Sequence, residues 1–590
     1  MENLYKRTHM CGALTAQNIG EAVVLNGWIQ KRRNLGGLIF CDLRDRTGVV
    51  QIVFDDDAPQ TLFKAADSLR SEYVVGVKGL VRAREAKNSA LATGDVEVCA
   101  GELLVYSRAE TPPIYVRDDD NADENLRLKY RYLDLRKHNM QRNLRIRHAA
   151  AKTTRDYFDE QGFTEIETPM LVKPTPEGAR DYLTPSRVNK GLFYALPQSP
   201  QLYKQLLMAS GADRYFQIVK CFRDEDLRAD RQPEFTQVDI EMSFADEDDV
   251  IAVQEGYLKR VFKDVLGLEI KTPFPRYSYR EALERFGSDK PDTRFGFELV
   301  CVNDAVRHCG FRVFSDAVAA GGDVRGINIT GGADRLSRKD VDKLQEDIKV
   351  FGAMGLAWVR IGAEGATSSF GRFFDAAETD SLTKLFSGKP GDLLLIVAGK
   401  RKVVFDSLGF LRREIAGRLG LLDDTRYDLL WVVDFPLLER DEEGGGFSAV
   451  HHPFTAPKPE DVGLLDTDPA AVRARAYDII LNGVELGGGS VRIHDRALQA
   501  KMFEVIGLSR EEAESKFGFL LEAFRYGVPP HGGLAYGFDR LVMLLLGEKS
   551  IREVIAFPKN QLAVCPVSGA PGEVSRAQLA ELALLGGEGK

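Results

Sequence analysis

The segment Glu234–Phe244 (EFTQVDIEMSF) constrains the fold more than any other, because its side chains alternate with a period of two. That period is typical of a β-strand with two distinct faces. One face receives Phe235, Gln237, Asp239 and Glu241, and the other receives Val238, Ile240, Met242 and Phe244. We therefore expect one face to join a core and the opposite face to present an aromatic ring and two carboxylates.

A second strand precedes this one and completes a strand–loop–strand unit. It covers Tyr215–Arg223 and is followed by the charged loop DEDLRADRQP. Arg223 stands where the strand enters the loop, so its guanidinium could hold a phosphate in a bidentate manner, while Phe235 could stack on a base. Taken alone, the same pattern also fits an ordinary hairpin with salt bridges.

The sequence YDIILNGVELGGGS predicts a hairpin, because Asn482-Gly483 between apolar runs is typical of a type I′ turn. A two-residue loop pairs Leu481 with Val484 and Ile480 with Glu485. Asp478 and Glu485 then share a face as near-diagonal neighbours. Two adjacent carboxylates repel each other unless a cation lies between them, so the pattern favours Mg²⁺ over a merely solvated acidic edge.

A third motif is a glycine-rich passage into a helix, GGLAYGFDRLVMLLLG, at residues 532–547. Its glycines permit close approach of the backbone to a ligand, and Arg540 falls in the first turns of the helix. Helix-end amides together with a guanidinium can bind an anion. Arg492, which follows the glycine triplet of the hairpin, is a further candidate for anion binding.

The N-terminal hundred residues read as five strands with one short helix, which suits a small OB-type β-barrel. We expect strands at 22–33, 38–44, 49–54, 73–84 and 96–106, and a helix at 58–69. Such barrels bind single-stranded nucleic acid through aromatic platforms and a basic rim. Trp28 and Phe40, with Lys31, Arg32, Arg33 and Arg44 nearby, could form such a surface, although strand aromatics are more often core residues.

Composition excludes several classes of protein. The 590 residues carry 79 Lys and Arg against 88 Asp and Glu, a net charge of −9, and 44% are hydrophobic, which is ordinary for a globular protein. No apolar run approaches the ~20 residues of a membrane span, and the first residues lack a signal-peptide core. The seven cysteines form no CxxC pair, so neither a zinc site nor a disulfide framework is indicated. A cytoplasmic enzyme without membrane contact is expected.

Changes in composition divide the chain into six parts. We expect an OB-type domain at 1–108, a hinge at 109–140, a core in two pieces at 141–289 and 425–565, an inserted α+β domain at 290–424 and a tail at 566–590. The hinge ends in a basic stretch, Arg127–Arg147, that is either a solvated helix face or a phosphate contact. A helix over 144–161 and a strand ending at Pro169 are predicted to open the core.

Together these motifs resemble the signature motifs of class II aminoacyl-tRNA synthetases. The helix and strand ending at Pro169 resemble motif 1, Arg223 through Phe235 resembles motif 2, and GGLAYGFDR resembles motif 3. An N-terminal OB barrel is similar to that of the aspartate, asparagine and lysine enzymes, and the insertion at 290–424 to that of the bacterial-type aspartate enzymes. The implied fold is multidomain α+β, with an antiparallel sheet flanked by helices as the catalytic core.

The resemblance implies ATP-dependent ligation of L-aspartate to tRNA(Asp) by a Mg²⁺-dependent homodimer. The implied aspartate-binding residues are Glu177, Ser199, Gln201, Lys204, Arg223, Asp239, His451 and Arg492, with His452 as an alternative to His451. The implied ATP-binding residues are Arg223, Asp224, Glu225, Gln232, Phe235, Glu485, Gly537, Phe538, Asp539 and Arg540, and Asp478 and Glu485 would hold the metal. For the tRNA anticodon the resemblance implies Arg32, Arg33, Phe40 and Gln51, which replaces the interpretation of Phe40 as a core residue.

Selection of aspartate over asparagine is expected to depend on Arg492 and Lys204, because asparagine would leave two buried cations without a partner.

Alternative functions remain open. An asparagine or lysine enzyme is disfavoured by the insertion and by Arg492. A relaxed enzyme would charge both tRNA(Asp) and tRNA(Asn), but Leu35 and Lys87 are more similar to the strict type. A catalytically dead RNA-binding paralogue would be expected to lack motif residues that are present here. The inserted domain either contacts tRNA or only packs.

Overall fold

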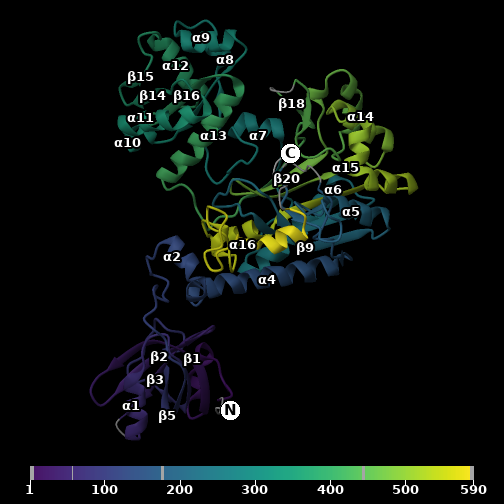
Figure 1. The fold of residues 1–590 in the computed structure, drawn as a ribbon. Coiled ribbons are helices and arrows are strands. Elements are labelled where there is room, and N and C mark those ends of the chain that lie inside the picture. The colour runs from purple at the N-terminus through teal and green to yellow at the C-terminus, as the bar shows by residue number, and fades with distance from the viewer. Residues whose placement is uncertain (1–4, 56–57, 175–178, 442–444, 585–590) are drawn as a thin grey trace. The chain divides into compact units, whose positions relative to one another are not determined.

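The structure is a computed structural model that describes residues 5–55, 58–174, 179–441 and 445–584, and its chain divides into two compact units. The first unit contains residues 1–149, 226–233 and 548–579. The second contains residues 150–225, 234–547 and 580–590. Each unit is described by itself below, and Figure 1 labels the elements of both.

The first unit begins with a closed five-stranded barrel in the order β1-β2-β3-β5-β4. Its elements are β1 (Ala22–Asn34), β2 (Ile39–Asp45), β3 (Gly48–Phe54), α1 (Gln60–Ser68), β4 (Val74–Ala83) and β5 (Val96–Ser107). Alternate residues of β1 are buried, and Val23, Leu25 and Ile29 join one apolar cluster inside the barrel. The predicted OB-type barrel is confirmed, and its strands end within two residues of the predicted positions.

The basic stretch after the barrel forms helices whose cations converge on one carboxylate. These helices are α2 (Glu124–Lys129), α3 (Arg131–Asp134) and α4 (His138–Glu160). Asp134 is fully buried and accepts ion pairs from Arg127 at 3.0 Å, Arg131 at 2.7 Å and Lys137 at 3.0 Å. Three of the basic side chains therefore form ion pairs inside the fold. For these three, the expectations of a solvated helix face and of a phosphate contact are both wrong.

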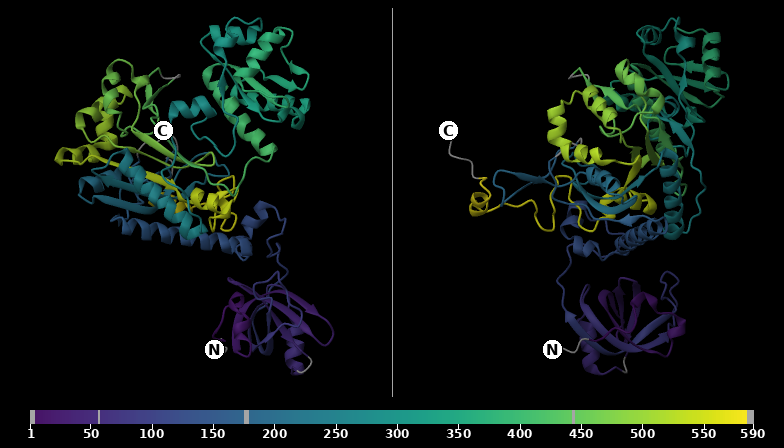
Figure 2. Two further views of the ribbon diagram at one scale, coloured as in Figure 1. Left: turned by 180° about the vertical axis from the view of Figure 1, so that it is seen from behind. Right: turned by 90° about the vertical axis from the view of Figure 1, so that its right-hand side faces the viewer.

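The second unit is built on an eight-stranded sheet in the order β11-β17-β20-β21-β22-β10-β9-β6, which is antiparallel except for the two pairs at its edges. Its strands are β6 (Thr164–Glu165), β9 (Arg214–Phe222), β10 (Glu234–Ser243), β11 (Arg276–Ser278), β17 (Leu429–Val433), β20 (Ala476–Leu481), β21 (Val484–Val491) and β22 (His531–Gly537). Its helices are α5 (Gln201–Ala209), α6 (Glu247–Val261), α7 (Tyr279–Phe286), α14 (Arg496–Val505), α15 (Arg510–Ala523) and α16 (Phe538–Leu546). Figure 2 shows this sheet with helices beside it.

A separate five-stranded sheet, in the order β12-β13-β16-β14-β15, lies between α7 and β17 in the sequence. Its elements are β12 (Val300–Cys301), α8 (Asn303–Val306), α9 (Arg312–Ala319), β13 (Asp323–Ile329), α10 (Gly332–Arg335), α11 (Arg338–Asp347), β14 (Ala357–Gly362), β15 (Gly365–Ser368), α12 (Ala376–Leu385), β16 (Leu393–Gly399) and α13 (Arg401–Arg418). Alternate residues of β16 enter two different apolar clusters, Leu393 and Leu395 on one side and Leu394 and Ile396 on the other. Both faces of this sheet are therefore covered.

Three local predictions differ from the structure. The segment ending at Pro169 forms only the two-residue strand β6, which pairs in parallel with β9. Phe244 lies beyond the end of β10 with a φ of 54° and is 76% exposed, so its expected place in the core is wrong. The tail at 566–590, whose sequence predicts a weakly amphipathic helix, forms only the short helix α17 (Arg576–Glu581) among the residues that the structure describes. Two short hairpin pairs, β7 (Leu183–Pro185) with β8 (Phe193–Ala195) and β18 (Leu438–Arg440) with β19 (Phe447–Ala449), were not predicted.

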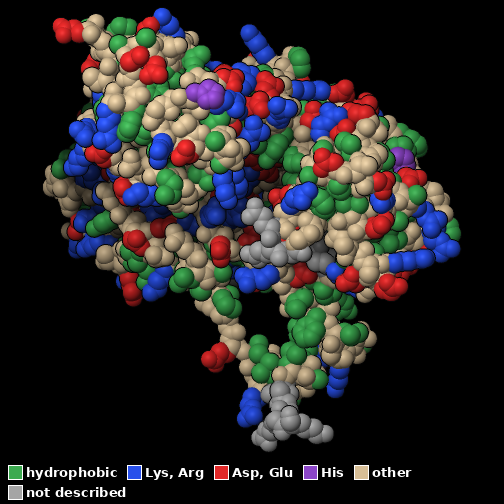
Figure 3. Space-filling model, turned by 90° about the horizontal axis from the view of Figure 1, so that it is seen from above, with side chains coloured by type: hydrophobic (Ala, Val, Ile, Leu, Met, Phe, Trp, Pro, Cys, Tyr) green, Lys and Arg blue, Asp and Glu red, His purple; other side chains and the backbone are tan. Residues whose placement is uncertain are grey.

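The surface carries charges of both signs. Figure 3 shows Lys and Arg interspersed with Asp and Glu over the face that it presents. All seven cysteines are free thiols. Among the helices that the structure describes, none is both long enough and apolar enough to cross a bilayer.

Candidate active site

The register of the central strands places the candidate site residues in neighbouring rows. Asp239 pairs with Ala535, Ala535 with Gly488, and Gly488 with Asp478. One step along the strands, Glu241 pairs with Gly533, and Gly533 with Ser490. Residues in register share a face of the sheet, so carboxylates of β10 and of the hairpin, which are far apart in the sequence, meet on one surface with β22 between them.

Glycines make room for two of these carboxylates. A Cβ on Gly488 would lie 2.3 Å from Asp478 Oδ1, and a Cβ on Gly533 would lie 2.1 Å from Glu241 Oε2. Both distances are far below van der Waals contact. The glycines were expected to let a ligand approach the backbone, and in the structure they give space to acidic side chains of neighbouring strands.

Two buried cations and two buried carboxylates form a closed ion-pair network on this face. Lys204 Nζ on α5 lies 2.8 Å from Asp239 Oδ1 and 3.2 Å from Glu241 Oε2. Arg492 binds Glu241 in a bidentate manner, with Nε 3.0 Å from Oε1 and Nη2 3.2 Å from Oε2. All four side chains are at most 3% exposed. The predicted convergence of Lys204 and Arg492 is therefore present.

The network corrects the charge argument made from the sequence. Glu241 already pairs with both cations, so an asparagine side chain would not leave them without a partner. Discrimination follows instead from the charge balance, since two cations face two carboxylates. Aspartate and asparagine share an ammonium group and an α-carboxylate, and aspartate alone adds a side-chain carboxylate that can pair with the two cations.

The two carboxylates of the network differ in acidity. Burial would raise the pKa of Glu241, but Arg492 and Lys204 outweigh it and lower the pKa to about 2. Burial raises the pKa of Asp239 to about 6, because Lys204 opposes it only in part and Glu241 adds to it. Asp239 Oδ2 is buried and accepts no hydrogen bond from the residues that the structure describes. It is a suitable acceptor for a ligand ammonium group.

A pH dependence follows from the raised pKa of Asp239. Only its carboxylate form can pair with an ammonium group, so kcat/KM for an amino-acid substrate should fall about tenfold per pH unit below about pH 6. Because the folded pKa exceeds the ordinary value of 3.8, the stability contributed by Asp239 is present at acid pH and is lost as pH rises through about 6. Pyrophosphate exchange at saturating ATP between about pH 5 and 8 tests this. A kcat/KM that stays flat below about pH 6 would contradict it.

The two adjacent histidines lie at different parts of the site. His452 Nε2 lies 2.7 Å from Arg492 Nη1, and Nη1 also donates to Ser490 Oγ at 2.7 Å. Burial and then Arg492 lower the pKa of His452 well below its ordinary value, so the imidazole is neutral. His451 Nε2 instead lies 3.8 Å from Asp478 Oδ1. Of the two histidines left open by the sequence, His452 therefore lies at Arg492 and His451 lies at Asp478.

The hairpin that carries Asp478 and Glu485 has the predicted turn. Leu481 pairs with Val484 and Ile480 with Glu485, and both Asn482 and Gly483 have positive φ. A register shift beyond Ile480 was not predicted. Burial and then the Glu485 charge raise the pKa of Asp478, whereas Lys290 and Arg540 outweigh burial and lower the pKa of Glu485.

The residues fit a magnesium ion held partly by a substrate. Among the described residues no group of three or more His, Cys, Asp or Glu is placed to hold a metal. Mg²⁺ commonly uses only one or two carboxylates and completes its shell with phosphates and water. Asp478 and Glu485 supply two hard oxygen donors that influence each other's pKa, which suits that arrangement.

Arginines from two motifs line the predicted nucleotide site. The Arg223 guanidinium lies 5.2 Å from the centroid of the Phe235 ring, and its Nε is buried without a hydrogen bond to a described residue. Arg540 on α16 donates from Nη1 to the Glu485 carbonyl oxygen at 2.8 Å. The backbone of the hairpin that carries Asp478 and Glu485 therefore orients Arg540.

Other predicted ATP-binding residues have structural partners. Asp539 is buried and accepts a hydrogen bond from the Thr236 amide at 2.7 Å, which ties α16 to β10. Gly537 ends β22 opposite Gln237, and Phe538 is buried at the start of α16. Asp224 pairs with Arg180 across an isolated bridge, and Glu225 lies next to it in the loop. Gln232 belongs to the first unit, where its amide exchanges two hydrogen bonds with the Lys559 backbone.

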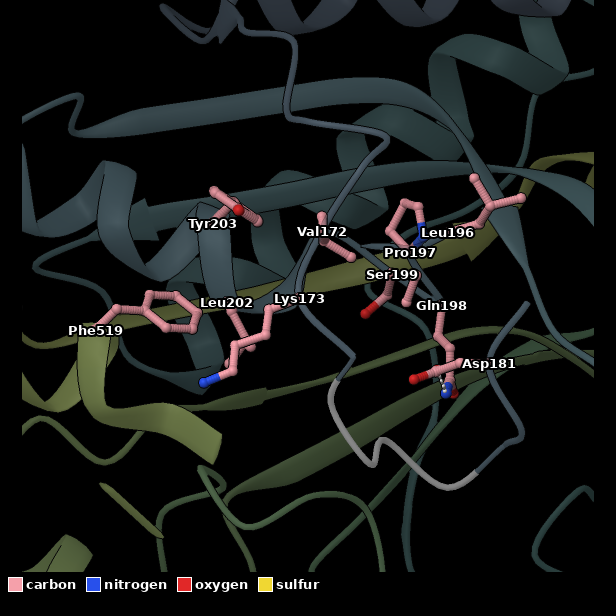
Figure 4. A pocket seen from close by; sticks show the side chains of 11 residues that line it. Val172, Lys173, Asp181, Leu196, Pro197, Gln198, Ser199, Leu202, Tyr203 and Phe519 are labelled. Atoms are coloured by element: carbon pink, nitrogen blue, oxygen red, sulfur yellow. Dashed lines mark hydrogen bonds between the residues drawn. The ribbon is translucent and has the colours of Figure 1, made fainter. Parts of the chain in front are cut away.

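A pocket lies at the start of α5, the helix that carries Lys204 (Figure 4). Ser199 lines it, together with Gln198, Asp181, Lys173 and Tyr203. Gln198 donates to Asp181 Oδ1 at 2.6 Å and exchanges hydrogen bonds with the Ala179 backbone. Gln201 is buried, and its Nε2 has no hydrogen-bond partner among described residues. Glu177, also predicted to bind aspartate, lies outside the described residues.

The predicted anticodon residues lie together on the barrel of the first unit. Arg33 lies 5.9 Å from the Phe40 ring and donates to Gln51 Oε1 at 3.1 Å, and Arg32 pairs with Asp67. Gln51 is buried and donates to Glu97 at 2.7 Å. Arg44 is also buried, in a pair with Glu72, so it does not belong to a basic rim. Leu35 is 72% exposed, and Lys87 pairs with Asp95 at 2.9 Å.

Sequence reasoning missed several residues of the site. The alternation of β10 placed Glu241 beside Asp239, which was a usable signal for its role. No sequence signal indicated Ser490, Gln198 or Lys290, because their positions depend on contacts between separate motifs. Lys290 lies 3.0 Å from Glu485 and is considered further below.

Comparisons with known proteins match both parts of the chain. Residues 123–561 match the family model for tRNA synthetases class II (D, K and N), and residues 23–105 match that for the OB-fold nucleic acid binding domain. An aspartate–tRNA ligase of Ruminiclostridium cellulolyticum is 58% identical over 98% of each chain. An aspartate–tRNA(Asp/Asn) ligase of Symbiobacterium thermophilum is 57% identical over 98% of this chain and 99% of its own.

Solved structures share the fold at low sequence identity. The asparaginyl-tRNA synthetase of Pyrococcus horikoshii, solved with asparaginyl-adenylate, superposes with a TM-score of 0.60 at 20% identity, over 94% of this chain and 98% of its own. The aspartyl-tRNA synthetase of Entamoeba histolytica gives 0.58 at 20% identity, over 94% and 92%. These likenesses show that the chain shares the fold of these proteins.

Proposed function

The chain belongs to the class II tRNA synthetases of the aspartate, lysine and asparagine group, and we propose that within it the protein ligates L-aspartate to tRNA(Asp). The observation that carries this choice is the network of Lys204, Arg492, Asp239 and Glu241. It offers cations to a side-chain carboxylate and a buried acceptor to an ammonium group. Relatives of more than half identity over nearly the full length carry the same activity in their names.

In the first step the α-carboxylate of aspartate attacks the α-phosphorus of ATP, and pyrophosphate leaves in line with the attack. Asp239 binds the ammonium group, and Arg492 and Lys204 bind the side-chain carboxylate. Arg223 holds the α-phosphate, Phe235 stacks on adenine, and Arg540 holds the γ-phosphate. These groups align the reactants and stabilise the added charge, so no covalent enzyme intermediate is required.

Asp478 and Glu485 would hold the Mg²⁺ that accompanies ATP. When bound, that ion neutralises phosphate charge during attack. In the second step the 3′-hydroxyl of the terminal adenosine of tRNA attacks the carbonyl carbon of the aspartyl-adenylate, an ester bond forms to the tRNA, and AMP leaves. Among the described residues no side chain stands out as the base, and a phosphate oxygen of the adenylate is suited to accept the proton.

The barrel reads the anticodon in this proposal, with Phe40 as a stacking platform and Arg32 and Arg33 near phosphates. Residues 290–424 are an inserted domain, supported by their separate sheet.

The functional form is a homodimer through α4 and the segment that follows it. Sedimentation at micromolar concentration tests this, and a monomer under conditions of full activity would refute it.

Assays of activation and charging test the function. Pyrophosphate exchange with aspartate, asparagine or lysine should give activity with aspartate alone. Charging of purified tRNA(Asp) and tRNA(Asn) should give product with tRNA(Asp) alone. Charging of tRNA(Asn) with aspartate would establish the relaxed enzyme instead, a possibility that a relative with that name keeps open. Absence of aspartate-dependent exchange would refute the proposal.

A further inference from the structure

Lys290 lies at the carboxylate pair but belongs to none of the three motifs. Its Nζ is 3.0 Å from Glu485 Oε2 and 3.7 Å from Asp289 Oδ2. The side chain is 40% exposed, so its ammonium group lies where solvent and a ligand can reach it. Lys290 stands in the segment between α7 and β12, which leads from the core into residues 290–424.

The segment around Lys290 is firmly held. Arg412 of α13 is buried and donates to the carbonyl oxygens of Phe297 at 2.8 Å and Gly296 at 3.0 Å, with a further contact to Asp292 at 3.3 Å. Arg294 pairs with the buried Asp292 at 2.9 Å. A helix that returns from the inserted sheet therefore fixes the backbone that carries Lys290.

The same segment also packs against the hairpin of β20 and β21, which carries Asp478 and Glu485. A Cβ on Gly483, at the hairpin tip, would lie 3.0 Å from Asp292 Cβ. Thr293 Oγ1 donates to Asp428 at 3.1 Å, and the Asp428 amide in turn donates to Asn482 Oδ1 at 2.9 Å. Lys290 and Glu485 therefore belong to two backbone segments that contact each other directly. These contacts hold the two side chains within reach of an ion pair.

The position of the ammonium group has a chemical consequence. In the free protein it pairs with Glu485 at 3.0 Å and lowers the repulsion between Glu485 and Asp478. Glu485 cannot give the same lone pairs to an ammonium group and to a divalent ion. A metal that uses Glu485 Oε2 displaces the Lys290 ammonium group, which then stays within the length of one flexible side chain of Glu485.

We propose that Lys290 substitutes for the divalent cation at Glu485 in the free enzyme and binds the β- or γ-phosphate of ATP once the metal occupies the site. No proton is transferred in this exchange, since the ammonium group only changes its acceptor from a carboxylate to a phosphate oxygen. The phosphate half of the proposal, in which Lys290 binds ATP, rests on the proposed function. The metal half, in which Lys290 and a metal compete for Glu485, concerns only Lys290, Glu485 and Asp478 and can be tested without amino acid or tRNA.

Binding of Mn²⁺ alone, followed by electron paramagnetic resonance, tests the metal half. Lys290→Met should bind Mn²⁺ about fivefold more tightly than the wild type, because the metal no longer competes with an ion pair worth about 1 kcal/mol. Glu485→Gln identifies the signal of this site by its loss. Lys402→Met is the matched control, since Lys402 pairs with Asp406 at 2.7 Å on the exposed face of α13. Unchanged Mn²⁺ affinity in Lys290→Met would overturn the proposal.

Pyrophosphate binding in the presence of Mg²⁺, measured by calorimetry, tests the phosphate half. Lys290→Met should weaken it about tenfold, and Lys290→Arg should restore most of the loss because it keeps the charge. The KM for aspartate should not change. Equal pyrophosphate affinity in wild type and Lys290→Met would overturn the proposal, whereas failure of the proposed function would appear separately, as absent aspartate-dependent exchange in the wild type.

Discussion

Replacement of Arg492 by leucine should lower kcat/KM for aspartate in pyrophosphate exchange by about 10³-fold. Arg492 is both the buried partner of Glu241 and the proposed partner of the substrate's side-chain carboxylate, and the substitution removes both interactions. Arg492 is 3% exposed and binds Glu241 through two nitrogens. Its loss removes the positive charge that balances the side-chain carboxylate of the substrate. Exchange with aspartate at graded concentrations gives the ratio directly.

The variant needs controls for stability, since Glu241 keeps only Lys204 as a cationic partner after the substitution. Thermal unfolding should show a folded but less stable protein. Arg475→Leu is the matched control, because Arg475 pairs with Glu247 at 2.6 Å away from this network. It should retain activity. Wild-type-like activation by Arg492→Leu would refute the assignment of the aspartate pocket.

Replacement of Arg223 by alanine should reduce the rate of adenylate formation by about 10²- to 10³-fold, as expected when a donor to developing charge is removed. Arg223 directly follows β9 and lies over the Phe235 ring, in the proposed nucleotide site. Arg223→Lys should recover little, because an ammonium group cannot make the bidentate contact of a guanidinium. Single-turnover measurement with ATP and aspartate isolates this step.

Arg214 provides the matched control for Arg223. It begins the same strand, lies 5.7 Å from the Phe163 ring and donates to the Gln161 carbonyl at 2.8 Å. Arg214→Ala should lose a comparable cation–π contact yet keep normal adenylate formation. If the two alanine variants slowed the step equally, the loss at Arg223 would reflect strand packing and not phosphate binding.

Local patterns in the sequence were sufficient for the elements that depend on neighbours in the chain. The period of two in 234–243, the Asn482-Gly483 turn and the strand-to-helix passage at Gly537 all have the predicted form. Turn chemistry and side-chain alternation are properties of a few consecutive residues, so they can be read without tertiary information. Phe244 departs from its pattern because the strand ends before it, with a positive φ.

Local sequence patterns were enough to predict the barrel, the central hairpin and the residue types available for binding a carboxylate, an ammonium group and a phosphate. Which charges neutralise each other depends on contacts between segments that are far apart in the chain. Glu241 pairs with Lys204 and Arg492, His452 stands at Arg492 while His451 stands at Asp478, and Lys290 reaches Glu485. Electrostatic pairing depends on distance in space and on burial, and strand register between remote segments sets both.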